Sequence, residues 1–183
     1  MIKNVLFAAA ARSRAQSVRP RIAYEVFLDL RKGREYSGTG RYVFELADTQ
    51  HVFLDFAGRA VTRGVLNGIA FEPQLREGKL HLPPEGLRAA ANELQLDFSN
   101  TYATDGNGVH SYEEEGQQFL YCQTEPYWGN RVFPMFDQPD LKGTLKLLTR
   151  SPEDWTVVAN EAERRAALFD VAEPFERRVR ELL

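Results

Sequence analysis

The sequence predicts an all-β protein that folds as a sandwich or meander of short strands. Two observations predict this class. Short apolar or alternating runs recur along most of the chain, and clusters of Gly, Pro, Asn and Asp separate them at even spacing. No internal repeat of fixed period competes with this interpretation. The chain has 183 residues, 43% of them hydrophobic, so it is long enough to bury a core without a disulfide or a metal.

The first three expected strands are defined by their composition. Residues 22–30, 36–46 and 51–56 are rich in β-branched and aromatic side chains, and the first alternates well enough for a half-buried strand. Gly38 and Gly40, inside the second run, indicate either a bulge or a close approach of a neighbouring group.

Turn residues define a hairpin and a series of shorter strands. Asn67-Gly68 is a strong two-residue hairpin signal, which predicts that residues 60–66 pair with residues 69–72. A turn cluster is expected at 105–108 and about one helical turn within 84–92. The remaining expected strands are residues 78–82, 93–99, 117–123, 144–149 and 155–159.

The two ends of the chain differ from its middle. Residues 5–11 form the longest uncharged apolar run, far short of the ~20 residues that a membrane span needs. The run is weakly similar to a signal peptide, but a short amphipathic or helical segment is the favoured interpretation. In the charged tail, Pro174 marks either a junction of two short helices or the end of a strand. One helical face of that tail would carry Leu168, Ala172, Phe175, Val179 and Leu182.

Charge and cysteine content argue against several classes of protein. The chain carries 23 Lys and Arg against 26 Asp and Glu, a net charge of -3, which argues against a dedicated nucleic-acid binder. Its single cysteine, Cys122, cannot form an internal disulfide, so we expect a reducing, cytoplasmic compartment. Because Cys122 lies within an apolar run, it is predicted to be a small buried hydrophobe and not a reactive thiol.

Neither metal nor nucleophile chemistry has a recognisable motif here. The histidines are His51, His81 and His110, and none has the H-E-x-x-H spacing of zinc proteases. The G-x-S-x-G and phosphate-loop strings are also absent. The acidic run 113–115 is expected to be a solvated loop. We therefore expect no metal site and no catalytic residue within this chain.

Residues 123–142 are different, because prolines, aromatic residues and ionisable groups are unusually dense there. Loops with so many rigid residues hold one shape, and binding residues often lie on such loops. The segment begins Gln123-Thr-Glu-Pro126 and continues Phe133-Pro-Met-Phe-Asp137.

This segment resembles the N-terminal domain of zinc aminopeptidases of the aminopeptidase N type, which are gluzincins. In that family the segment begins with Q-x-E-P, continues to an arginine, and ends with F-P-C-F-D-E-P-x-x-K. Further strings are similar: Leu54-Asp-Phe-Ala-Gly58 to L-D-F-x-G, and Gly108-Val-His-Ser-Tyr112 to G-L-H-x-F. Residues 151–160 are similar to the family's P-x-x-W-x-V-x-S-N strand. Met135, where the family usually has Cys, and Gly129-Asn130 depart from the pattern.

The resemblance implies a saddle-like β-sandwich and a division of the chain into three parts. These are an N-terminal extension over residues 1–17, a β-domain over 18–160, and a charged tail over 161–183. Glu125 would grip the free α-ammonium of a peptide substrate, with Gln123 and Tyr127 beside it. Arg131 and Asp137 would be structural, as an ion pair that anchors the loop.

The resemblance also implies which part of the enzyme this chain lacks. The zinc motif and the G-A-M-E-N motif belong to a catalytic domain that would begin after Asn160, and neither string occurs here. Zinc would therefore belong to the full-length enzyme, and this chain alone is expected to be inactive. Its expected partners are a catalytic zinc domain and a peptide N-terminus, with no nucleic acid and no membrane.

Two alternatives to an aminopeptidase fragment stay open from the sequence. The chain could be a stand-alone, non-catalytic aminopeptidase-like domain for protein interaction. A generic ligand-binding sandwich would share the fold, but it would not explain the similarity over residues 123–142.

Overall fold

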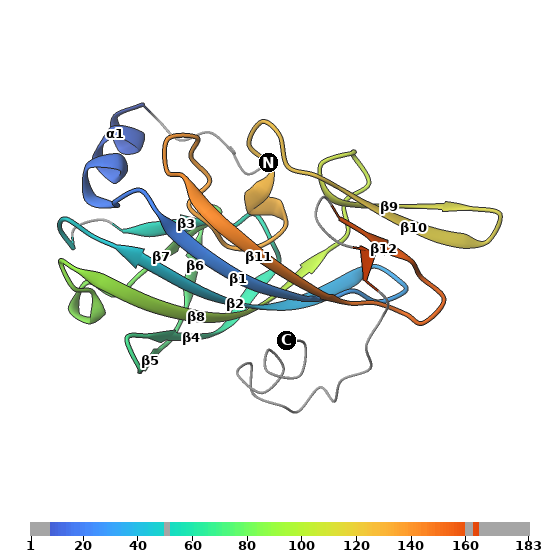
Figure 1. Cartoon of the computed structure of the whole chain (residues 1–183), viewed down its shortest axis with the longest axis horizontal. Coiled ribbons are helices and arrows are strands. Elements are labelled where there is room, and N and C mark those ends of the chain that lie inside the picture. Colours follow the sequence, from blue (N-terminus) through green and yellow to red (C-terminus); the bar gives the residue numbers. More distant parts are fainter. Residues whose placement is uncertain (1–7, 50–51, 160–162, 165–183) are drawn as a thin grey trace.

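The computed structural model describes residues 8–49, 52–159 and 163–164, and it confirms the all-β fold (Figure 1). One α-helix, α1 (Ala8–Ser17), precedes the first strand, as expected for a short helical N-terminal segment. No helix among the described residues is long and apolar enough to cross a membrane.

The main sheet has six strands in the order β11-β1-β2-β8-β4-β5. Neighbouring strands are antiparallel, except that β11 lies parallel to β1. Their bounds are β1 (Ile22–Asp29), β2 (Glu35–Glu45), β4 (Ala60–Leu66), β5 (Ile69–Phe71), β8 (Ala91–Thr101) and β11 (Gly143–Arg150).

Alternation of side chains gives the main sheet one buried face. In β2 and β8 every second residue is buried, which places Tyr42, Phe44, Leu94 and Leu96 in the core. Gly38 proves to be a site of close approach and not a bulge, because β2 keeps its register there. A Cβ on Gly38 would lie 2.4 Å from the ring of Phe98.

A smaller layer packs on this buried face. It consists of the three-stranded sheet β3 (Phe53–Asp55), β7 (Lys79–His81) and β6 (Gln74–Arg76), together with the loop that precedes β11. Phe56 packs edge-on against Phe98 at 5.5 Å between ring centroids, and Phe44 against Phe136 at 5.3 Å. The two layers therefore share one apolar core, as in a sandwich.

The remaining elements are short. A two-stranded ribbon, β9 (Gly108–Glu114) and β10 (Gln117–Gln123), projects from the body in Figure 1. Single 3₁₀ turns occur at η1 (Pro84–Gly86) and η2 (Gly129–Arg131), and β12 (Val157–Val158) pairs with β13 (Glu163–Arg164). The Asn67-Gly68 hairpin is confirmed, because both residues have positive φ and connect β4 to β5.

Some expectations differ from the structure, and others fall outside the described residues. Cys122 is exposed, so its predicted burial is wrong: β10 belongs to a separate two-stranded ribbon and not to the sheets that enclose the core. Strands β6 and β9 were not expected. Three expectations lie outside the described residues: those for His51, for residues 1–7 of the extension, and for the helical face within residues 165–183 of the tail.

Candidate functional site

The segment after β10 makes a tight turn that presents Glu125. Gln123 is the last residue of β10 and pairs with Gly108 of β9. The Trp128 N–H donates a hydrogen bond to the Thr124 carbonyl at 2.8 Å, which closes the turn. Glu125 and Pro126, joined by a cis peptide bond, lie within it.

The three residues predicted to contact substrate are exposed and close in sequence, Gln123 at the end of β10 and Glu125 and Tyr127 on this turn. Gln123, Glu125 and Tyr127 all face solvent, and Tyr127 is 47% exposed. No described residue forms an ion pair with Glu125. The turn therefore carries a carboxylate that a cation can approach.

An aromatic face leads along the ribbon to this turn. Tyr112 of β9 and Phe119 of β10 are exposed and stacked at 5.1 Å, and His110 lies 4.7 Å from Tyr121. Strand alternation puts Gln123 on the same face as Phe119 and Tyr121. Sequence reasoning missed this face, because the acidic run after Tyr112 suggested a loop.

Arg131 fixes the outer side of the loop, although not through the expected partner. Its guanidinium pairs with Asp105 at 2.8 Å and lies 5.1 Å above the Trp128 ring. The hydrogen bond from Arg131 holds the pKa of the Asp105 carboxyl below its usual value. The predicted Arg131–Asp137 ion pair is wrong, because Arg131 turns outward toward the segment before β9.

Asp137 lies on the inner side of the same loop. Its carboxylate accepts a hydrogen bond from the Asn130 N–H at 3.0 Å, and its own N–H donates to Asp55 Oδ2 at 3.2 Å. Burial raises the pKa of the Asp137 carboxyl, and the charge of Asp55 adds to this, while Asn130 and Arg14 oppose it. Asp137 therefore ties the two ends of the loop 130–137 together.

The main sheet holds the loop through buried polar side chains. The Tyr36 hydroxyl donates to the Val132 carbonyl at 2.8 Å, and the Asn100 amide donates to the Arg131 carbonyl at 2.7 Å. Burial holds the pKa of Tyr36 well above its ordinary value, so its hydroxyl stays a donor. These contacts fix the η2 turn next to the Glu125 turn.

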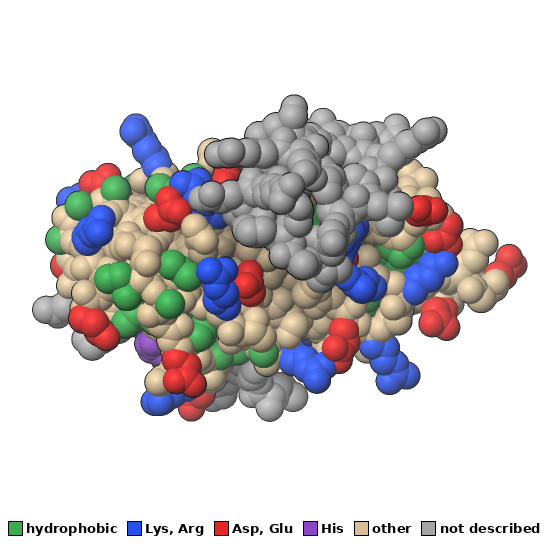
Figure 2. All heavy atoms as spheres, turned by 90° about the horizontal axis from the view of Figure 1, so that it is seen from below, with side chains coloured by type: hydrophobic (Ala, Val, Ile, Leu, Met, Phe, Trp, Pro, Cys, Tyr) green, Lys and Arg blue, Asp and Glu red, His purple; other side chains and the backbone are tan. Residues whose placement is uncertain are grey.

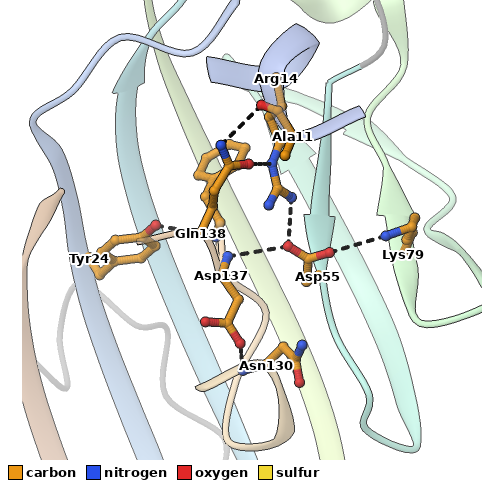
Figure 3. Close-up of polar contacts among 9 residues, drawn as sticks. Ala11, Arg14, Tyr24, Asp55, Lys79, Asn130, Asp137 and Gln138 are labelled. Atoms are coloured by element: carbon orange, nitrogen blue, oxygen red, sulfur yellow. Dashed lines mark hydrogen bonds and ion pairs between the residues drawn. The ribbon is translucent and has the colours of Figure 1, made fainter. Parts of the chain in front are cut away.

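Asp55 joins three segments at the other end of the loop (Figure 3). Arg14 Nη1 of α1 lies 2.5 Å from Asp55 Oδ2, and Lys79 Nζ of β7 lies 3.3 Å from Oδ1. The Gln138 amide accepts a hydrogen bond from Arg14 Nε at 2.9 Å and donates one to the Ala11 carbonyl at 3.0 Å. Asp55 belongs to the Leu54-Asp-Phe-Ala-Gly58 string that the sequence singles out, whereas no sequence pattern points to Arg14.

The described residues do not fit a zinc ion. They contain no group of three or more His, Cys, Asp or Glu side chains that could hold a metal. His110 uses Nδ1 to accept a hydrogen bond from the Gly106 N–H at 3.0 Å. A catalytic zinc needs three protein ligands, so no reaction step can be assigned to zinc bound by this part of the chain.

The surface charges are mixed. On the face shown in Figure 2, basic and acidic side chains are interspersed, with hydrophobic side chains between them. The described residues that are visible on that face therefore form no continuous basic patch of the kind that binds a phosphate backbone.

Comparison with known proteins gives a consistent result. The family model described as the peptidase M1 N-terminal domain matches residues 22–180. Aminopeptidase N of Streptomyces lividans is 34% identical over 147 residues, which cover 75% of this chain and 17% of that protein. A probable aminopeptidase 1 of Sulfurisphaera tokodaii is 27% identical over 139 residues, with the same two coverages of 75% and 17%.

A solved structure shows the same fold. The M1 zinc metallopeptidase of Deinococcus radiodurans superposes with a TM-score of 0.59 at 16% identity, over 81% of this chain and 38% of that one. A mutant of that enzyme bound to a Tyr-Ser-Ala substrate gives a TM-score of 0.60. This chain thus spans 17% of the length of those two aminopeptidases and 38% of the solved chain.

Proposed function

Because the chain belongs to the family of peptidase M1 N-terminal domains, we propose that it serves as the N-terminal domain of a zinc aminopeptidase. In this role it packs against a catalytic domain that holds the zinc. It supplies Glu125 to the place where that enzyme binds the free N-terminus of a peptide, with Gln123 and Tyr127 beside it.

The exposed carboxylate of Glu125 is the observation that carries the proposal. It lies on a turn held by the Trp128–Thr124 hydrogen bond, and no described residue neutralises it. A peptide's α-ammonium group would make a charge-assisted hydrogen bond with it, which is stronger than a neutral one. A catalytic domain that covers the turn would exclude water and strengthen this attraction further.

The same contact explains selection for a free N-terminus. An acylated N-terminus has no ammonium group, so binding it would leave the Glu125 carboxylate covered and unpaired. Unpaired buried charges are costly, and sites built around such a contact reject ligands that lack it.

The aromatic face of the ribbon is the surface proposed to contact the catalytic domain. Tyr112, Phe119 and Tyr121 are 44%, 39% and 47% exposed, and aromatic side chains are enriched at protein interfaces. The face leads directly to Gln123, so a domain seated on it would also cover the Glu125 turn.

We also propose a cytoplasmic location, because the single cysteine is typical of a reducing compartment. Fractionation of the producing cells checks this location.

The test reassembles an enzyme from two chains. The full chain is expressed with the catalytic part of the Streptomyces lividans aminopeptidase N, and hydrolysis of aminoacyl fluorogenic substrates is measured. We expect a complex that is active with zinc. Replacing Glu125 by Ala should lower kcat/KM by about 10- to 100-fold, since hydrogen bonds to charged groups contribute about 1.5–3 kcal/mol.

A matched control separates the role of Glu125 from a general effect of charge. Glu72 is an exposed carboxylate that follows β5 at the far edge of the main sheet, and Glu72→Ala should leave kcat/KM unchanged. If no complex forms, the proposed packing is wrong. If Glu125→Ala leaves kcat/KM of the complex unchanged, the substrate role is wrong and a domain for protein interaction remains.

A further inference from the structure

Helix α1 is attached to the body by polar contacts with motif residues. Its two buried residues are Arg14 and Ser17, so no continuous apolar stripe holds it in place. The Arg14 side chain is 1% exposed and ends between Asp55, before the Phe-Ala-Gly58 string, and Gln138, next to Asp137. Figure 3 shows the guanidinium reaching down from α1 into this group.

The contacts of the buried Arg14 side chain hold it in one rotamer. Its guanidinium carbon lies 4.7 Å from the centre of the Phe53 ring, and Nη1 pairs with Asp55. Its Nη2 is buried without a hydrogen-bond partner in the described structure. A buried arginine that leaves one donor unsatisfied adds little net stability, so its value lies in the arrangement that the other contacts impose.

A continuous chain of contacts runs from Arg14 to the Glu125 turn. Asp55 Oδ2 accepts from both Arg14 and the Asp137 N–H. The Asp137 carboxylate in turn accepts from the Asn130 N–H in η2. The η2 turn follows Trp128, whose N–H closes the Glu125 turn.

The backbone reinforces this connection. Asp55 and Met135 exchange two hydrogen bonds, N–H to carbonyl at 2.7 Å and 3.0 Å. The Ala57 N–H also donates to the Asn130 carbonyl at 2.9 Å. A shift of Asp55 would therefore move both ends of the loop 130–137.

We propose that Arg14 is a positioning residue, which acts through Asp55 and Asp137 to hold the loop 130–137 and, next to it, the turn that presents Glu125. Helix α1 is then part of the machinery of the site, although it lies before the first strand of the domain. The consequence for substrate binding rests on the proposed function; the coupling within the chain does not.

Hydrogen exchange on the full chain tests the coupling. In Arg14→Gln, the amides of Trp128, Asn130 and Asp137 should exchange at least 10-fold faster, while amides at the centre of the main sheet keep their rates. Arg12 is exposed on the same helix, so Arg12→Gln is the control for loss of one charge and should change neither set. Arg14→Lys keeps the charge beside Asp55 and should restore part of the protection.

The outcomes separate positioning from simple stabilisation. Equal acceleration of loop and main-sheet amides, or no acceleration at all, overturns the proposal. Should Arg14→Gln fail to fold, Gln138→Ala removes the Gln138 hydrogen bonds to Arg14 and Ala11 and leaves the Arg14–Asp55 ion pair in place. A smaller acceleration is then expected, again confined to the loop amides, and equal acceleration of the main-sheet amides overturns the proposal.

A kinetic measurement on the reassembled enzyme tests the link to Glu125. Arg14→Gln should raise KM for unblocked substrates several-fold with little change in kcat, since the reacting centre lies in the other domain. If Arg14→Gln accelerates hydrogen exchange in the loop but leaves KM for unblocked substrates unchanged, the link between Arg14 and Glu125 is overturned. Failure of the Glu125 variants themselves would count against the proposed function and leave the measured coupling intact.

Discussion

Gly108 shows how one residue determines where Arg131 lies. It has φ +72°, and a Cβ placed on it would lie 2.8 Å from Arg131 Cβ. Gly108→Ala should therefore destabilise the fold by more than the ~1–2 kcal/mol expected for a left-handed alanine alone. Displacement of Arg131 should also weaken its pair with Asp105. Urea denaturation measures the first effect, and NMR shifts of the Trp128 indole measure the second.

Gly116 provides the matched control for backbone strain. It has φ +76° in the β9–β10 turn, but a Cβ there would meet no atom within 4 Å. Gly116→Ala should therefore lower the free energy of unfolding only by the cost of left-handed backbone strain, and it should leave the NMR shifts of the Trp128 indole unchanged. Equal losses of stability at both glycines would mean that the contact with Arg131 does not constrain the loop.

Residue identities were easier to predict than residue partners. The similarity over residues 123–142 placed Gln123, Glu125 and Tyr127 on one segment, and in the structure all three are exposed, at the end of β10 and on the turn that follows it. Whether they bind substrate stays a prediction. The Arg131–Asp137 pair was wrong because a motif gives spacing along the chain, whereas partners depend on which side of the loop each side chain faces.

At the scale of elements, the parallel pairing of β1 with β11 ends at a buried charge pair. Asp29 and Arg150 are partners in register, and Arg150 Nε donates to Asp29 Oδ1 at 2.8 Å. Burial opposes ionisation of Asp29, but hydrogen bonds from Arg150 and Arg31 outweigh it and hold the Asp29 pKa below its usual value. The ionised carboxylate therefore stabilises the folded state.

The pH dependence follows from the direction of that shift. A lowered pKa in the folded state contributes stability that is fully present above the unfolded pKa of about 3.9 and is lost as the pH falls through the folded pKa. Asp29→Asn should destabilise the protein at pH 7 by about 3–5 kcal/mol, because it removes the buried carboxylate charge with which Arg150 and Arg31 pair. Urea denaturation at pH 7, 5 and 3 should show this difference shrinking toward acid pH.

An exposed pair is the control for that experiment. Lys32 and Asp154 are 59% and 62% exposed, so Asp154→Asn should change stability little at any of these pH values. A difference between the wild type and Asp29→Asn that stays constant from pH 7 to pH 3 would mean that Asp29 does not act through its charge.

Strand prediction succeeded where local pattern determines the outcome. Alternation and turn residues located β1, β2, β4, β5 and β8 to within about two residues, because side-chain burial repeats every second position. Strand β6 has only three residues, too few for a pattern, and the acidic end of β9 hid its alternation. No local signal pairs β11 with β1, since their partners lie 121 residues apart.

For the whole molecule, the fold class and family similarity could be read from the sequence, but the place of α1 could not. Residues 8–17 carry no apolar periodicity that would predict docking. Their attachment depends on Arg14 meeting Asp55, a contact between residues 41 positions apart. Such a contact follows from the folded arrangement of three segments, which only the structure provides.

The last prediction concerns the activity of the chain alone. Zinc catalysis of peptide hydrolysis lowers the pKa of a bound water from 15.7 to about 7, which takes three protein ligands around the metal. The sequence holds three histidines and no H-E-x-x-H string. The role proposed for Glu125 is to bind an ammonium group, which activates no water. The purified chain with added zinc should therefore hydrolyse no aminoacyl substrate, whereas the reassembled two-chain enzyme should. Zinc-dependent turnover by the purified chain, absent from metal-free controls, would show that this domain contains a catalytic centre of its own.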